Sequence, residues 1–210
     1  RDLWPRVEPL LSRVERPARY LNHEWGSSAP VAEGDFAFCM IYPDTYELGQ
    51  ANQAVRILVN AVNATDGMGA ERAFLPAEDM ADLMREEGVP LFSLESCRPV
   101  ADFDVVGITL PHELAATNVL GTLDLAGIPL RTADRAEGDP IVLAGGPCAY
   151  NPEPYAPFFD VILVGEGEEQ LPETLALIRE LRASGAPRAE SLREVVRRVG
   201  GAYVPRLYRW

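Results

Sequence analysis

Short runs of consecutive apolar residues alternate with helix-length segments along most of this chain of 210 residues. Four runs are well defined, and they span Phe36–Tyr42, Asp104–Leu110, Pro140–Ala144 and Asp160–Val164. A short continuous apolar run is typical of a strand that is buried on both faces, as in a parallel sheet. Because helical segments separate the runs, we predict an α/β fold with three layers. It is a doubly wound, mostly parallel sheet of the flavodoxin-like or Rossmann-like type.

The remaining segments complete this alternation. We expect weaker strands at 70–75 and 91–94, a turn at 43–49, and an extended exit segment at 203–210. Apolar periodicity predicts helices over 2–16, 50–63, 76–87, 113–126, 169–183 and 190–199. We divide the chain into an N-terminal helix and loop extension (1–34), the α/β domain (35–185) and a C-terminal helix with a linker (186–210).

The charge and the cysteines exclude several classes of partner and site. With 32 acidic against 19 basic residues, the formal net charge is −13. Such a chain repels phosphate groups, so we expect neither nucleic acid nor a membrane surface as a partner. The three cysteines, Cys39, Cys97 and Cys148, are odd in number and far apart. We therefore expect a cytoplasmic protein with reduced thiols and no metal site of its own.

The candidate binding residues follow the predicted strands. Ligands of such sheets bind beyond the carboxyl ends of the strands, and four loops follow the well-defined runs, at 43–49, 109–113, 145–151 and 165–168. Two of these loops are rich in glycine, which adopts conformations closed to other residues and leaves room for a ligand. Each glycine taken alone is better explained by an ordinary strand-to-helix turn. As a set at successive strand ends, they favour one pocket mouth.

Three segments carry a combined pattern: Gly145-Gly-Pro, Pro152-Glu153, and Phe159–Glu169 with its Gly-Glu-Gly-Glu turn. This pattern resembles the fingerprint of cobalamin-binding domains fused to radical S-adenosylmethionine (SAM) enzymes. Phe103–Thr109 resembles the strand that precedes it in those domains. Further segments, at 19–21, 42–49, 90–96 and 118–129, resemble one subgroup of these proteins, and the likeness covers most of 17–182.

The resemblance implies a flavodoxin-like domain that holds cobalamin against a following barrel. That barrel would bind SAM and a 4Fe-4S cluster on three cysteines, which this chain lacks. We therefore expect the chain to be the N-terminal portion of a longer protein. Its partner would be its own downstream barrel, and the fragment alone would not be an enzyme. The sequence permits both a monomer and a homo-oligomer.

The same resemblance implies which residues grip the nucleotide tail and one edge of the corrin. They are Pro43, Asp44, Tyr46, Gly49, Thr109, Leu110, Gly145, Gly146, Pro147, Gly165, Glu166, Gly167 and Glu168. We assign no catalytic residue and no metal ligand to this chain.

One residue departs from the pattern of related domains that ligate cobalt through histidine. Those domains carry Asp-x-His-x-x-Gly after the first strand, whereas this sequence has Asp44-Thr-Tyr46-Glu-Leu-Gly49. A phenol with a pKa near ~10 is a poor axial ligand at neutral pH. The resemblance therefore implies cobalamin in its base-off form without a histidine ligand, an arrangement that suits methyl transfer.

Two other functions stay open. The domain is alternatively a cobalamin-like structural or interaction module that has lost the cofactor. A free-standing flavin or nucleotide enzyme is the weakest alternative. No phosphate-binding glycine motif occurs, and the acidic Gly165–Glu168 turn would repel a phosphate.

Overall fold

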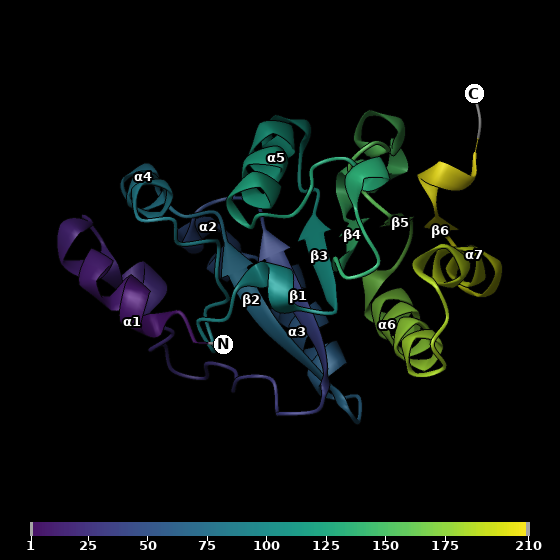
Figure 1. The fold of residues 1–210 in the computed structure, drawn as a ribbon, viewed down its shortest axis with the longest axis horizontal. Coiled ribbons are helices and arrows are strands. Elements are labelled where there is room, and N and C mark those ends of the chain that lie inside the picture. The colour runs from purple at the N-terminus through teal and green to yellow at the C-terminus, as the bar shows by residue number, and fades with distance from the viewer. Residues whose placement is uncertain (1, 209–210) are drawn as a thin grey trace.

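A six-stranded sheet lies between two layers of helices in the computed structural model, which describes residues 2–208 (Figure 1). The strand order is β2-β1-β3-β4-β5-β6, from left to right in the figure. The first five strands are parallel, and β6 pairs antiparallel with β5. The strands are β1 (Phe36–Tyr42), β2 (Met68–Phe74), β3 (Val105–Thr109), β4 (Ile141–Gly145), β5 (Val161–Leu163) and β6 (Ala202–Tyr203). The predicted doubly wound α/β fold is confirmed.

Within residues 2–208, seven α-helices accompany the strands. They are α1 (Trp4–Val7), α2 (Tyr46–Ala51), α3 (Gln53–Asn63), α4 (Glu78–Glu86), α5 (Ala116–Leu125), α6 (Gly167–Ala183) and α7 (Arg188–Arg198). Helices were predicted at each of these places except α2, with ends that differ by a few residues. None of the helices within residues 2–208 is long and apolar enough to cross a membrane.

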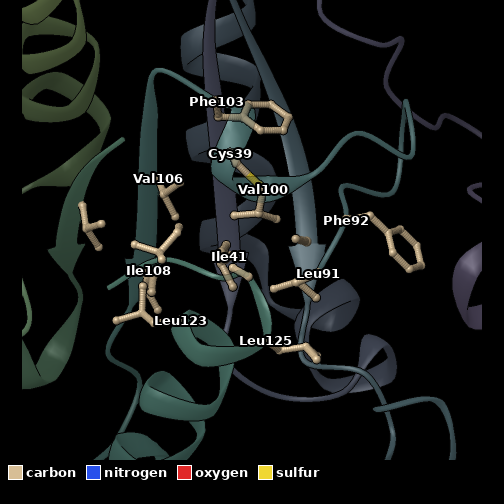
Figure 2. Close-up of a cluster of buried hydrophobic side chains, with 14 of the residues drawn as sticks. Cys39, Ile41, Leu91, Phe92, Val100, Phe103, Val106, Ile108, Leu123 and Leu125 are labelled. Atoms are coloured by element: carbon tan, nitrogen blue, oxygen red, sulfur yellow. The ribbon is translucent and has the colours of Figure 1, made fainter. Parts of the chain in front are cut away.

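Side chains that alternate along the strands fill two separate cores. From β1, Cys39 and Ile41 enter the core beneath α1, α4 and α5. Phe38 and Met40, their neighbours on the same strand, enter the core beneath α3, α6 and α7. Figure 2 shows the first core, where Ile108 of β3 lies close to Leu123 of α5. Burial on both faces explains why β1 is a continuous apolar run.

The N-terminal segment 22–31 lies against β2, which is an edge strand of the sheet and is buried along its whole length. The Val31 N–H donates to Glu71 Oε1 at 2.9 Å. Arg72 donates to Asn22 Oδ1 at 2.8 Å and forms an ion pair with Glu95 at 2.6 Å. The segment therefore fastens the N-terminal part of the chain to the sheet. The domain boundaries at 34 and 185 stay a prediction.

The predicted N-terminal helix over 2–16 is wrong beyond its first turn. Helix α1 ends at Val7, and a 3₁₀ turn, Glu8–Arg13, follows it. Pro9 has no N–H to donate to the carbonyl of Pro5, and in an α-helix its ring would crowd that carbonyl. Pro9 therefore disfavours continuation of α1, although α6 does continue through Pro172.

The turn predicted at 43–49 is also wrong, because α2 begins at Tyr46 within it. Helix α3 starts at Gln53 and not at residue 50, because Asn52 caps it. The side-chain Oδ1 of Asn52 accepts hydrogen bonds from the N–H groups of Ala54 and Val55 at 3.0 and 3.4 Å. An asparagine cap of this kind satisfies donors that the first helical turn leaves free.

Two predicted extended segments are shorter than expected. The strand at 91–94 reduces to a single bridge between Phe92 and Pro99, because the Leu91 N–H donates to the carbonyl of Leu125 instead. The exit segment at 203–210 holds the end of β6 and then a 3₁₀ turn, Pro205–Leu207. Residues 209 and 210 lie outside the described part of the chain.

Candidate functional site

A cavity of about 340 Å³ lies where the strand order of the sheet reverses. The chain runs from β1 to β2 and then to β3 on the other side of β1, so the reversal falls between β1 and β3. In open α/β sheets ligands bind beyond the carboxyl ends of the strands at this point. Met40, Leu143 and Leu163 line the cavity from three strands. Residues of α3 and α6 complete its walls, so the cavity lies on the face of the sheet that these two helices cover.

Gly107 on β3 makes the base of the cavity possible. A Cβ at this position would lie only 2.6 Å from Cζ of Phe38, so the Phe38 ring occupies the space directly above Gly107. Phe38 is fully buried, and its ring lines the cavity beside Gly107. The packing of one aromatic ring against a glycine thus sets the depth of the cavity.

The two glycine-rich loops line the mouth. Gly145 continues the face of β4 that Leu143 occupies, and a Cβ there would have no neighbour closer than the Leu163 carbonyl oxygen, at 3.9 Å. A Cβ at Gly167 would lie 3.0 Å from Leu58 of α3. Glycine at these two positions keeps space open that side chains would otherwise fill.

Gly146 holds a backbone conformation that only glycine adopts readily, with φ 107° and ψ −175°. A Cβ there would lie 3.1 Å from both the Leu110 carbonyl oxygen and Thr109 Oγ1. We expect Gly146→Ala to lower the free energy of unfolding by about 1–3 kcal/mol, measured by urea denaturation. Gly145→Ala is the matched control, and it should change the same quantity by less than about 0.5 kcal/mol. Equal stability of the two variants would contradict the assigned conformation.

Seven of the thirteen residues that the sequence singled out line this cavity. They are Thr109, Gly145, Gly146, Pro147, Gly165, Gly167 and Glu168. The other six do not line it, and they are Pro43, Asp44, Tyr46, Gly49, Leu110 and Glu166. The loops after β3, β4 and β5 are therefore brought together at one site.

The segment after β1 turns away from the cavity. The ring of Tyr46 packs edge-on against Phe74 with 5.5 Å between the ring centroids, and Gly49 lies against the same phenylalanine. Leu110 is buried in the core on the opposite face of the sheet. The positions of Tyr46 and Gly49 follow from the helical conformation of α2, which carries Tyr46 towards β2.

Sequence reasoning missed the wall that helix α3 supplies, which consists of Asn52, Ala54 and Leu58. The spacing of Ala54 and Leu58 is the signal that places both on one face of a helix. It does not tell which layer of the fold that face meets.

Gln170 is the second residue that sequence reasoning missed. Its side-chain amide donates to the carbonyl oxygens of Val164 and Gly200 at 3.2 and 2.5 Å. Its own Oε1 is buried without a hydrogen-bond partner within the described residues, beside Gly165. A buried acceptor without a donor carries an energetic cost, which a ligand with a donor group would relieve.

The residues that line the cavity offer mainly apolar contacts and few ionisable groups. Glu168 is the single charged residue among the described residues that line it, and no histidine, cysteine or arginine joins it. Within residues 2–208 no group of three or more metal-ligating side chains occurs. The mainly apolar walls and the few polar atoms suit a ligand with a flat apolar part and hydroxyl groups.

A family model described as "Radical SAM proteins, N-terminal" matches residues 54–205, which is well over half of the chain. The matched range includes the loops after β3, β4 and β5 that line the cavity. Strand β1 and α2 lie outside it. No curated protein and no solved structure matches the chain.

Proposed function

The chain belongs to the family of N-terminal domains of radical SAM proteins, and from this premise we propose that it is a cofactor-holding module. Its cavity takes the nucleotide tail of cobalamin in the base-off form, in which the tail's own base has left the cobalt. A downstream barrel with a 4Fe-4S cluster and SAM is the proposed partner. This chain supplies binding and orientation, which is the general part of a protein in cofactor chemistry.

The size of the cavity is the observation that carries the proposal. Ligand pockets usually enclose about 300–1,000 Å³, and this one, of about 340 Å³, is at the lower end of that range. It has room for a heteroaromatic base with its ribose, whereas a corrin ring is too large to enter. The cavity is open, and Tyr46 does not fill it. A domain that has lost the cofactor would be expected to fill such a cavity with its own side chains.

The lining also suits the chemistry of that tail. Met40, Leu143 and Leu163 offer apolar contact to the base. The Thr109 hydroxyl offers a hydrogen bond to the ribose. Glu168 repels the phosphate of the tail, so the phosphate stays at the solvent side of the mouth.

Neither histidine of this chain lines the cavity. His112 is exposed and does not line the cavity, and His23 belongs to the N-terminal extension. We therefore infer a lower cobalt face without a protein ligand. When bound, cobalamin would supply a cobalt centre that can carry a methyl group. The three cysteines are free thiols, in keeping with a cytoplasmic location.

Titration with hydroxocobalamin tests the proposal. We expect saturable one-to-one binding to the 210-residue chain, followed by absorbance and calorimetry. The electron paramagnetic resonance spectrum of bound cob(II)alamin should lack splitting from an axial nitrogen. The variants His23→Ala and His112→Ala should bind as the unchanged chain does.

Cobinamide is the matched control ligand, because it has the corrin ring but no nucleotide tail. It should bind more weakly than hydroxocobalamin by at least about tenfold, since burying an aromatic group contributes about 1.5–3 kcal/mol. Equal affinity for the two corrinoids would contradict a tail-binding cavity. Absence of hydroxocobalamin binding would contradict the proposed function as a whole.

A further inference from the structure

A second cavity, of about 480 Å³, lies on the opposite face of the sheet, beside α5. Val119 of α5 forms one wall, and the loop that follows β4 forms the other. Pro147 lines both cavities, so the turn around it separates them. The second cavity plays no part in holding a nucleotide tail.

Aromatic rings dominate the wall opposite α5. Tyr155 is 7% exposed, and Phe158 is half-buried beside it. Tyr150 lines the rim and is 74% exposed, which is unusual for so large a ring. The faces of aromatic rings are electron-rich and attract cations.

The charge of the lining is negative. Glu113 is the one charged side chain that lines this cavity within the described residues. Its side chain is exposed, and its carboxylate has no hydrogen-bond or ion-pair partner in residues 2–208. Burial raises the pKa of the Cys148 thiol, and the charge of Glu113 adds to this effect. Burial also raises the pKa of the Tyr155 hydroxyl, with smaller contributions from Cys148 and then Glu113. Both groups are therefore neutral at pH 7, and Glu113 alone sets the charge.

We propose that this cavity binds a small organic cation, in which an aromatic or branched alkyl body carries an ammonium group. The body fills the space between Val119 and Phe158. The ammonium group pairs with Glu113 and contacts the rings at the rim. A carboxylate or phosphate ligand is repelled by Glu113, and a neutral ligand gains nothing from it.

Three probes of the same shape test this inference: 2-phenylethylamine, 2-phenylethanol and 3-phenylpropanoate. The measurement is the chemical-shift change of the ¹⁵N-labelled 210-residue chain without cobalamin. Failure here is thus separate from failure of the proposed function. We expect the amine to bind about threefold more tightly than the alcohol, because its ion pair with the exposed Glu113 carboxylate is screened by solvent. The carboxylate should not bind.

Two variants locate the site. Glu113→Gln should reduce the affinity for the amine to that for the alcohol, whereas Glu173→Gln, at an exposed position on α6, should leave it unchanged. Tyr150→Ala removes an exposed ring without disturbing the core, and it should weaken amine binding about threefold. Equal binding of the amine and the alcohol, retention of the preference in Glu113→Gln, or no saturable binding of any probe would each overturn the inference.

Discussion

Replacement of Asp160 by alanine is expected to lower the free energy of unfolding by about 3–5 kcal/mol. Asp160 Oδ2 accepts hydrogen bonds from Arg135 at 2.8 Å, from Arg188 at 2.7 Å and from the N–H of Val142 at 2.9 Å. The side chains of Asp160 and Arg135 are completely buried, and that of Arg188 is 5% exposed. Without the carboxylate, two buried guanidinium groups lose their counter-charge.

The cost is large because the arginines stay charged. Burial lowers the pKa of Arg135 from its ordinary value, but an arginine still holds its proton at neutral pH. Each guanidinium also donates to backbone carbonyls, among them those of Phe158 and Pro140. The triad thereby joins the start of β5 to α7 and to the loop before β4.

Urea denaturation followed by circular dichroism measures this effect. Asp160→Asn keeps an acceptor oxygen and should cost less than the alanine variant. Glu194→Ala is the surface control, because Glu194 pairs with Arg197, whose side chain is 74% exposed. That variant should change the stability by less than about 1 kcal/mol. A similarly small effect of Asp160→Ala would show that the triad is not closed as described.

Replacement of Gly145 by leucine is expected to reduce the affinity for hydroxocobalamin by a factor on the order of 100 or more, which corresponds to about 2.8 kcal/mol. The new side chain would enter the cavity of about 340 Å³ from β4. The fold should tolerate it, because nothing lies within 3.9 Å of the Cβ position and Gly145 has no positive φ.

Two comparisons separate a blocked cavity from a damaged fold. Gly138→Leu makes the same change at a glycine outside this cavity with no atom within 4 Å of its Cβ position, so its affinity should equal that of the unchanged chain. Cobinamide, which has no tail to lose, should bind Gly145→Leu as it binds the unchanged chain. If Gly145→Leu keeps its full affinity for hydroxocobalamin, the tail does not lie between α3 and α6.

The strands were predictable because burial on both faces leaves a direct mark on the sequence. Strand β1 needs apolar side chains for two cores and has the bounds that its run predicts, Phe36–Tyr42. The loops after β3, β4 and β5 lie at the same edge of the sheet because these strands are parallel, and this could be predicted from the alternation of strands and helices. Strand β6 was not predictable, since two residues carry no period. Its pairing also depends on Gly201, where a Cβ would overlap the carbonyl of Val164.

The composition of the site was harder to predict, because it depends on the face of the sheet towards which each loop turns. The loop after β4 directs Gly145 to one cavity and Cys148 to the other. Neighbouring residues thus serve separate sites, and no local pattern marks the division. The lining by α3 and the displacement of Tyr46 towards Phe74 arise in the same way, from packing between distant segments.

The contacts along β2 limit how this sheet can associate with other proteins. On this edge strand the N–H groups of Ala70 and Arg72 already donate to Asn63 Oδ1 and Glu95 Oε2, at 2.7 Å each. The Arg72 carbonyl oxygen accepts from the Leu94 N–H. On the other side β6 offers only two residues for pairing. A foreign strand would therefore find few free backbone groups at either margin of the sheet, which disfavours polymerisation through strand addition.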